Sequence, residues 1–385
     1  MKIERFYLII IIVGLFFVRQ NFADAKKSSG RLVLENADSG YGEVRDGQRV
    51  SILSQNVRLR QDSVIMLCDS AVRYMDDERT MLIGHVHIFD STKSLFGDKV
   101  DYMESQKLVI ARDNVRFVDT SKTFVADFLK YFQDSEILMA DSNVSIIDIN
   151  ESSTLTGAHL EYHRETGYGK VTGNPVFSQE DSTENLVLTI SGDFMEMFND
   201  GDSLRVKDNV EITRGNIVAH GDSLKFFKPR DLIVLESSPT AFEDQDYLTG
   251  DAIQLHLKEN KVDQIFVLGH AIVTTKVDSP ITPHIPYNLL TGDRIWVKLK
   301  DQKIDSVRIQ GKATSYYHVI EEDEEKGINK VLCDELLILF TDGVVKKVYG
   351  SSRPGLSNGQ FSPPGKQKQL ETELAELLQK LGLAY

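Results

Sequence analysis

The chain repeats itself with a period of 29 residues, and this period constrains its fold more than any other feature. The first mark of the repeat is a small residue followed by aspartate. Steps of 29 residues separate the aspartates within two groups, which are Asp69, Asp98 and Asp127, then Asp193, Asp222 and Asp251. Later steps stretch to 42 and 41 residues, which predicts insertions in the last units. Such a repeat predicts an elongated stack of similar units rather than the two globular domains that 385 residues would otherwise suggest.

Apolar and polar residues alternate after each mark. Val100 and Tyr102 follow one of the aspartates, with the polar Asp101 between them. The second mark is a valine after a turn-forming residue, such as Val115, and Phe117 follows it two residues later. A period of two is that of a half-buried strand, and no helical pattern separates the strands. We therefore expect an all-β fold of stacked two-strand rungs and exclude a βαβ sheet.

Equal units stack most simply in register. Their apolar positions then form ladders along the stack, one of valines and another that contains Tyr102, Tyr131 and Tyr162. With rungs about 4.8 Å apart, about nine rungs would give a body roughly 40 Å long. The two end rungs would present unpaired backbone groups, which invite aggregation or a partner strand.

The N-terminus has the pattern of a secretory signal. A basic start precedes an apolar run from Tyr7 to Val18, and Ala23 and Ala25 offer the small residues that signal peptidase reads. The run is short for a bilayer span, although an uncleaved membrane anchor is the alternative. We expect residues 1–25 to be a signal peptide and the protein to be exported.

The later part of the chain differs from the regular repeat. Residues 26–250 carry the repeat, whereas residues 251–350 are a divergent section in which Trp296 and Leu337 replace a polar residue. Both faces of that section are partly apolar, which predicts that it is covered or faces a second copy. Residues 351–385 begin as a Gly/Pro-rich linker and turn into an amphipathic helix. We expect this helix to cap an end of the stack, with partner binding as the alternative.

No constellation for catalysis or metal binding emerges from the sequence. The formal net charge of −14 disfavours nucleic acid, which needs a basic face. The stretch from Gly221 to Leu224 spells an esterase signature, but it belongs to the repeat, and no histidine follows an aspartate by three residues. The histidines offer no visible set of three or four converging metal ligands. We therefore expect no enzymatic activity, no cofactor and no metal.

A fuller pattern spans the unit from Val86 to Val115. It reads Val86-x-Ile88, then Gly97-Asp98-x-Val100-x-Tyr102, then Leu108-x-Ile110, then Asn114-Val115. This unit resembles the OstA-like, LptA-type repeat of the lipopolysaccharide-transport proteins. The resemblance extends over most of residues 31–275 and more loosely over residues 290–350, where it is similar to the longer OstA-like proteins of Bacteroidota-type bacteria. It implies a V-shaped β-jellyroll, an open half-pipe (β-taco) in the periplasm, and it brings no catalytic residues.

The resemblance implies a function in lipid transport. An apolar ladder in an open V can bury acyl chains by removing their area from water. We therefore expect a periplasmic bridge that carries lipopolysaccharide or a similar amphiphile towards the outer membrane, with which it could associate. Its end rungs would pair by strand addition with inner- and outer-membrane transport components, or join copies head to tail. The predicted lipid-groove residues are Val86, Ile88, Val100, Tyr102, Val115, Phe117, Leu129, Tyr131, Val144, Ile146, Leu160, Tyr162, Met195, Met197, Leu224 and Phe226.

The main alternative is a non-enzymatic structural β-solenoid, such as an envelope scaffold or adhesin. Its interior would be packed shut, whereas a carrier needs a gap between its walls. One departure from the pattern is Arg73, which replaces an inward tyrosine or aliphatic residue. It is expected to be a solvated edge residue, with a phosphate contact at the groove end as the alternative. The acidic balance further predicts that the cargo is held by its tails rather than by charge.

Overall fold

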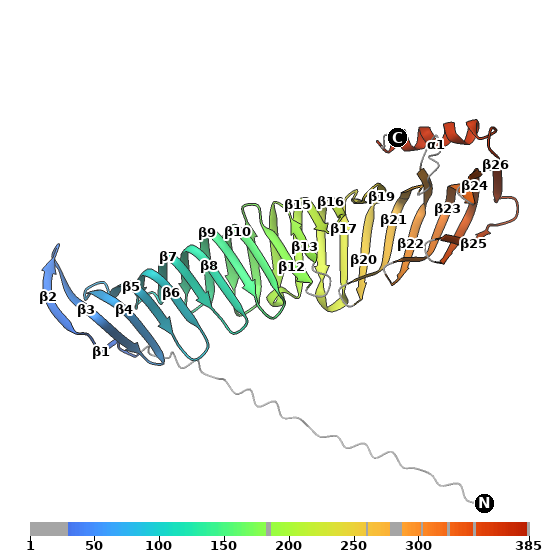
Figure 1. The fold of residues 1–385 in the computed structure, drawn as a ribbon. Coiled ribbons are helices and arrows are strands. Elements are labelled where there is room, and N and C mark those ends of the chain that lie inside the picture. The colour runs from blue at the N-terminus through green and yellow to red at the C-terminus, as the bar shows by residue number, and fades with distance from the viewer. Residues whose placement is uncertain are drawn as a thin grey trace, which may run out of the picture.

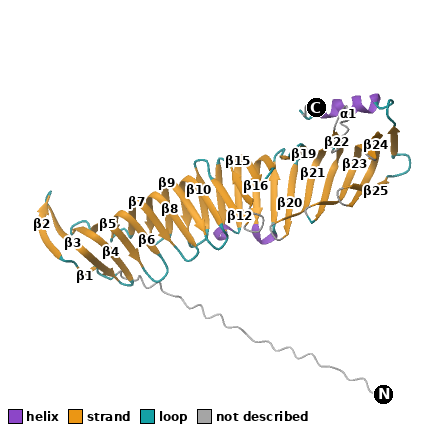
Figure 2. Ribbon diagram, in the orientation of Figure 1, coloured by secondary structure: helices purple, strands orange, loops and turns teal. Residues whose placement is uncertain are grey.

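The computed structural model describes residues 30–181, 186–258, 261–277, 287–301, 303–321, 324–341 and 344–382. Within them the chain forms one elongated sheet of 26 strands, followed by an α-helix (Figures 1 and 2). The expected all-β class with a short C-terminal helix is confirmed. The predicted signal peptide, residues 1–25, lies outside the described residues. Among the described residues no helix is both long and apolar enough to cross a bilayer.

The strands follow one another closely along the chain. The first group is β1 (Val33–Asn36), β2 (Ser39–Arg45), β3 (Gln48–Gln61), β4 (Val64–Tyr74), β5 (Arg79–Phe89), β6 (Ser94–Met103), β7 (Leu108–Val118), β8 (Lys122–Phe132), β9 (Ile137–Asp148), β10 (Ser153–His163), β11 (Tyr168–Thr172), β12 (Val176–Asp181) and β13 (Leu186–Ser191). The second group is β14 (Phe194–Phe198), β15 (Ser203–Arg214), β16 (Ile217–Phe227), β17 (Leu232–Glu236), β18 (Thr240–Glu243), β19 (Asp246–Thr249), β20 (Ala252–Lys258), β21 (Lys261–Lys276), β22 (Tyr287–Lys300), β23 (Lys303–Glu321), β24 (Glu324–Thr341), β25 (Val344–Ser351) and β26 (Asn358–Ser362). The α-helix is α1 (Lys368–Lys380).

Consecutive long strands are antiparallel neighbours. β3 pairs with β4, β4 with β5, and so on to β10, and the long strands β21 to β24 continue in the same way. Each long strand is therefore one level of the stack, short strands such as β11 and β12 share a level, and a two-strand unit fills two levels. Because each level adds about 4.8 Å, the body is about twice as long as the roughly 40 Å expected. The expected length was wrong because the two strands of a unit lie one after the other along the axis.

Each long strand bends once near its middle, so one sheet makes two walls. In β7 the register shifts between Arg112 and Val115, where Asp113 and Asn114 have φ angles of 61° and 52°. We call the wall that contains Leu108–Arg112 wall A, the wall that contains Val115–Val118 wall B, and the line of bends between them the spine. Neighbouring strands bend at the same height, so the walls form a V. The lips of the V are the hairpin turns at the wall ends.

The two marks of the repeat meet at the spine. Asn114 Nδ2 donates to Asp98 Oδ2 over 2.7 Å, and His85 Nδ1 lies 2.7 Å from Asp69 Oδ2. Asparagine and aspartate tolerate the left-handed backbone that a bend requires, and their side chains form hydrogen bonds where the ladder is interrupted. The polar residues that mark the repeat in the sequence therefore lie at the bends of the strands. The same pairing joins Asn56 to Asp38, Asn143 to Asp127, Asn209 to Asp193 and His270 to Asp251.

Helix α1 lies on the outer face of wall B rather than at an end of the stack (Figure 1). Glu373 accepts hydrogen bonds from Lys330 Nζ over 2.5 Å and from the Tyr316 hydroxyl over 3.1 Å. The expectation of an end cap was wrong, because an edge strand offers backbone groups whereas the strand faces here offer apolar side chains. The buried helix leucines Leu370, Leu374 and Leu378 cluster with Leu289 of β22, Tyr316 of β23 and Ile328 of β24.

The spine geometry predicts that Asn114→Val destabilises the protein more than Asn114→Gly. Both variants lose the hydrogen bond to Asp98, but only valine resists the left-handed φ that glycine adopts freely. We expect the free energy of unfolding to fall by about 1–2 kcal/mol more in the valine variant, seen as a lower urea midpoint. Equal midpoints would show that the left-handed bend does not constrain this position.

Candidate functional site

The candidate site is the interior between the two walls. All the predicted groove residues are buried there and belong to one continuous apolar cluster. The ladder of Tyr102, Tyr131 and Tyr162 exists, with Val109 and Leu138 on the strands between them. On wall A lie Val100, Tyr102, Leu129, Tyr131, Leu160, Tyr162, Met195, Met197, Leu224 and Phe226. On wall B lie Val86, Ile88, Val115, Phe117, Val144 and Ile146.

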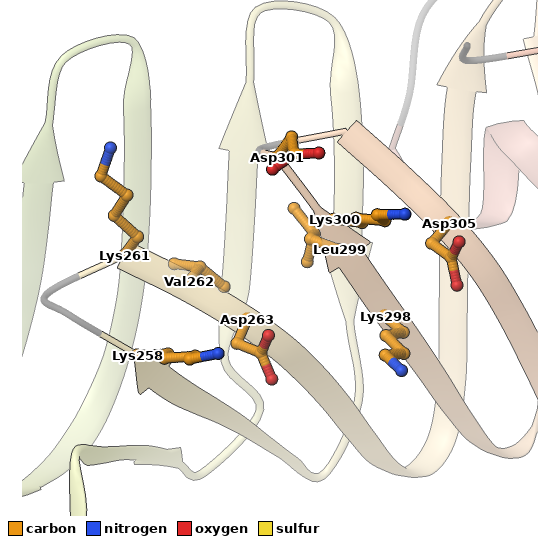
Figure 3. A pocket seen from close by; sticks show the side chains of 9 residues that line it. All are labelled: Lys258, Lys261, Val262, Asp263, Lys298, Leu299, Lys300, Asp301 and Asp305. Atoms are coloured by element: carbon orange, nitrogen blue, oxygen red, sulfur yellow. The ribbon is translucent and has the colours of Figure 1, made fainter. Parts of the chain in front are cut away.

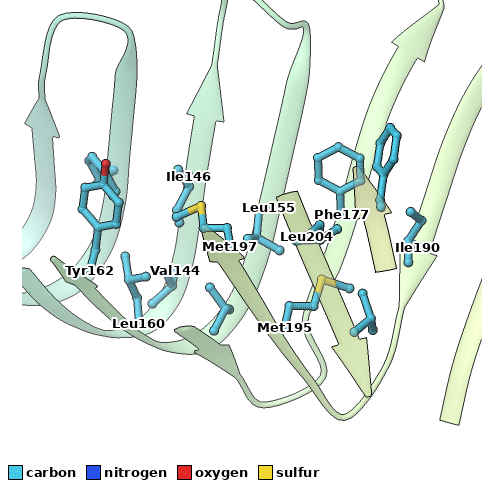
Figure 4. Packing of buried hydrophobic residues seen from close by; sticks show 14 of the residues in the cluster. Val144, Ile146, Leu155, Leu160, Tyr162, Phe177, Ile190, Met195, Met197 and Leu204 are labelled. Atoms are coloured by element: carbon cyan, nitrogen blue, oxygen red, sulfur yellow. The ribbon is translucent and has the colours of Figure 1, made fainter. Parts of the chain in front are cut away.

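Large side chains fill the interior over the first half of the molecule. The ring of Phe117 on wall B lies 5.4 Å from that of Tyr131 on wall A, measured between centroids. Phe124 on wall B lies 5.0 Å from Tyr162 in the same way. Figure 4 shows how side chains from the two walls, among them Tyr162 and Phe177, gather between the strands. Here the two apolar faces bury one another from water.

A cavity opens where the wall B ladder changes to small residues. Beyond Phe177 the ladder passes through Ile190 and Ile212 to Ala219 and Ala241. Alanine leaves empty the space that phenylalanine fills earlier, and an apolar cavity of about 210 Å³ lies at this point. An adjoining cavity of about 90 Å³ shares part of its lining. The wall A side of the larger cavity includes Ile233, Leu255, Ile265 and Val297.

Polar pairs join the lips of the two walls, and we call them lip latches. Arg164, after β10 on wall A, donates through Nε and Nη2 to Asp119 Oδ2 on wall B over 2.9 and 2.7 Å. Their side chains are only 13% and 17% exposed. Burial, the largest single influence, would lower the pKa of Arg164, but the hydrogen bonds and charge of Asp119 together with Tyr131 and Glu136 outweigh it, so that pKa is raised. A second latch joins Lys228 Nζ of wall A to a Glu151 carboxylate oxygen of wall B over 2.5 Å.

The interior becomes polar towards the N-terminal end. Arg73 lies in register with Thr80 and so with the Tyr102 ladder, and its Nη2 is 2.8 Å from Glu104 Oε1. Burial raises the pKa of Glu104, while Arg73 opposes the shift. The Tyr102 hydroxyl donates to Gln61, and burial raises the pKa of Tyr102 to about 12. Arg73 is thus a half-buried ion-pair partner, which corrects the expectation of a solvated edge residue.

Sequence reasoning missed the residues that line the cavity. The predicted groove ends at Phe226, whereas the larger cavity is lined by residues between Ile212 and Ile304. The sequence signal for the cavity is that the wall B ladder changes from phenylalanine to alanine at Ala219 and Ala241. That signal becomes readable only when the strand register assigns both alanines to the ladder that contains Phe177.

Residues 29–168 match the model of a family described as OstA-like protein. This part of the chain is OstA-like. The resemblance drawn from the sequence is therefore confirmed over these residues. The OstA-like segment contains the Asp119–Arg164 latch and much of the filled interior, and the cavity lies C-terminal to it.

A comparison with solved structures finds LptH from Pseudomonas aeruginosa, described as the LptA homologous periplasmic component of the conserved lipopolysaccharide transport device. It is 15% identical to this chain, and the match covers 38% of this chain and 95% of that one, with a TM-score of 0.29. No curated protein matches the chain.

The latch geometry predicts that Asp119→Asn destabilises the protein. The substitution keeps the side-chain shape but removes one of the two carboxylate charges that face the largely buried Arg164, the other being that of Glu136. We expect the free energy of unfolding to fall by about 1–3 kcal/mol, measured by urea denaturation. The matched control is Asp134→Asn, because Asp134 pairs with Lys107 over 2.8 Å but is 73% exposed. That control should change stability by less than about 0.5 kcal/mol, and equal losses in both variants would contradict the role of the latch.

Proposed function

We propose that this protein is a periplasmic carrier that holds lipopolysaccharide or a similar amphiphile by its acyl chains between walls A and B. The observation that carries the proposal is the apolar cavity of about 210 Å³ within a continuous apolar interior. Phe242 and Ile304 line this cavity and are 37% and 36% exposed, so the cavity reaches solvent. An acyl chain can therefore reach it from the mouth of the V.

The energetics of the interior favour a carrier over a structural scaffold. Each methylene group moved from water into an apolar site contributes about 0.8 kcal/mol, without any specific polar contact. A scaffold gains most from an interior that is filled along its whole length, because an empty cavity costs contacts and stability. The empty cavity beside Ala219 and Ala241 lowers the stability of the protein, and an acyl chain bound there would restore the missing apolar contacts.

The filled half of the interior is compatible with the same function. Without cargo, apolar walls bury their surface most simply against each other, as Phe117 and Tyr131 do. A chain that passes through this half exchanges those contacts for contacts with its own methylene groups. Such an exchange changes the buried area little. The lip latches on either side must then stretch or open, which makes them part of the transport path.

Both ends of the sheet support pairing with partners by strand addition. At one end every residue of β2 is exposed, including Tyr41 at 58% and Val44 at 71%. At the other end Tyr349 of β25 and Phe361 of β26 are 51% and 54% exposed. We infer that these edges join membrane-bound transport components, or further copies of this chain head to tail.

The proposed location is the periplasm, free or associated with the outer membrane, with residues 1–25 as the signal peptide. The division into repeats of residues 26–250, a divergent section of residues 251–350 and a tail of residues 351–385 is retained as part of the proposal. The cavity crosses the boundary at residue 250, since it is lined from both sections. The divergent section therefore continues the groove in this proposal.

A photo-crosslinker at Leu255 tests the carrier function. Leu255 lines the cavity, whereas Gln254 precedes it on the same strand and points to the opposite face. We expect lipopolysaccharide adducts in cells from position 255 and few or none from position 254, detected by immunoblotting and mass spectrometry. Adducts from neither position, or equally from both, would favour the scaffold.

Filling the cavity should reduce lipid capture without unfolding the protein. Ala241→Phe introduces the side chain that the same ladder carries at Phe177. We expect several-fold fewer adducts from a crosslinker at Leu255, because the ring occupies the space of the acyl chain. The urea midpoint should be equal or higher, since filling a cavity commonly stabilises a protein. Unchanged capture at an unchanged midpoint would contradict binding at this site.

A further inference from the structure

A polar cavity also lies at the lip of wall A, beside the two apolar cavities. Residues near the adjoining ends of β20, β21, β22 and β23 line it, and its volume is about 930 Å³ (Figure 3). Val262 and Leu299 line both this cavity and the larger apolar one, so the two compartments adjoin. The charged residues that line the polar cavity, among those the structure describes, are Lys258, Lys261, Lys298, Lys300, Asp263, Asp301 and Asp305.

We propose that this lip cavity binds the phosphorylated head group of the amphiphile whose acyl chains occupy the apolar cavity. The inference rests on the proposed carrier function and extends it from the tails to the head. An amphiphile needs an apolar and a polar compartment in contact with each other, and the shared residues Val262 and Leu299 provide that contact. A phosphate monoester or diester fits because the cations of the cavity are lysines, which bind phosphate as point charges.

The strand alternation explains why the two compartments meet at these tips. Leu299 turns into the apolar cavity, and its neighbours Lys298 and Lys300 point away from it towards solvent. Leu257 and Lys258 repeat this arrangement on the neighbouring hairpin, where Leu257 lines the smaller apolar cavity. Long lysine side chains keep their ammonium groups in water while their methylene stems lie along apolar surface. The acyl chain of a ligand held at the lip would therefore contact leucine side chains, and its head group would contact lysine side chains.

The local charge at the lip differs from that of the whole chain. Among the described residues of the cavity lining there are four lysines and three aspartates, whereas the chain has a formal net charge of −14. Lys258, Lys298 and Lys300 are exposed, and none of the described residues forms an ion pair with them. Their ammonium groups can turn to a ligand without breaking an existing pair. The interleaved carboxylates limit the attraction, which suits a contact that must later be released.

The test compares two synthetic probes with the full mature protein. One is an acylated disaccharide that carries two phosphates, and the other is the same molecule without phosphate. The lip variant combines Lys258→Gln, Lys298→Gln and Lys300→Gln, and a control variant with the same charge change combines Lys107→Gln, Lys130→Gln and Lys170→Gln. We expect the lip variant to bind the phosphorylated probe about tenfold more weakly and the dephosphorylated probe unchanged. The control variant should bind both probes like the wild type.

Asp301→Asn provides a change in the opposite direction. Asp301 is exposed in the hairpin turn with a φ of 51°, a conformation that asparagine also tolerates. Removing its negative charge should tighten binding of the phosphorylated probe several-fold and leave the dephosphorylated probe unaffected. If Asp301 had only a structural role, the substitution would change the affinities for the two probes equally. Added salt should weaken binding of the phosphorylated probe in the wild type more than in the lip variant.

The outcomes separate this inference from the carrier function. If neither probe binds, the carrier proposal fails. If both probes bind but the lip and control variants behave alike, the head-group site is overturned and the carrier proposal stands. Vesicles of phosphatidylglycerol identify the source of the phosphate. Binding to them with the same lysine dependence assigns the site to phospholipids, and preference for the disaccharide assigns it to a phosphorylated glycolipid.

Discussion

The bend at the spine is the constraint on which the rest of the structure depends. An antiparallel sheet propagates through its backbone hydrogen bonds, and a bend in one strand must be matched in the next or the ladder is lost. Residues such as Asn114 supply the left-handed backbone, and side-chain bonds such as that to Asp98 supply polar contacts where the ladder is interrupted. Because these pairs recur along the stack, one sheet forms both walls. The V shape follows from chemistry at the spine, before any residue of the interior is considered.

Once the spine is set, the size of each ladder residue decides whether the interior is filled or empty. The distance between opposing positions is fixed by the bend, so Phe117 and Phe124 reach the tyrosines opposite, whereas Ala219 and Ala241 do not reach the other wall. Antiparallel pairing continues through both sections, although at Ala241 one level is divided between the short strands β17 and β18. The alanines at two ladder positions therefore accompany the change from core to cavity while both walls continue.

The sequence could predict which residues face the interior, because a period of two fixes the face of every residue once one is known. Val100 and Tyr102 were found in this way, and they are buried as expected. The same period carries no information on which strand pairs with which, so the length of the stack was underestimated. The helix was misplaced because its leucine stripe shows only that an apolar partner exists. The cavity and the ion pair of Arg73 with Glu104 depend on contacts across the interior or between successive levels, which alternation along one strand does not encode.

The charge of the chain illustrates a similar limit of sequence reasoning. A formal net charge of −14 describes the field far from the molecule, but salt screens exposed charges beyond about 10 Å. In the proposed site, a head group at the lip would interact with the few residues within that distance, among them Lys298, Lys300 and Asp301. The expectation that the cargo is held by its tails rather than by charge was drawn from the total charge, whereas the proposed head-group site depends on residues that the fold brings together near the ends of β20–β23. The place of a charge relative to the cavity therefore matters more than the sum of all charges.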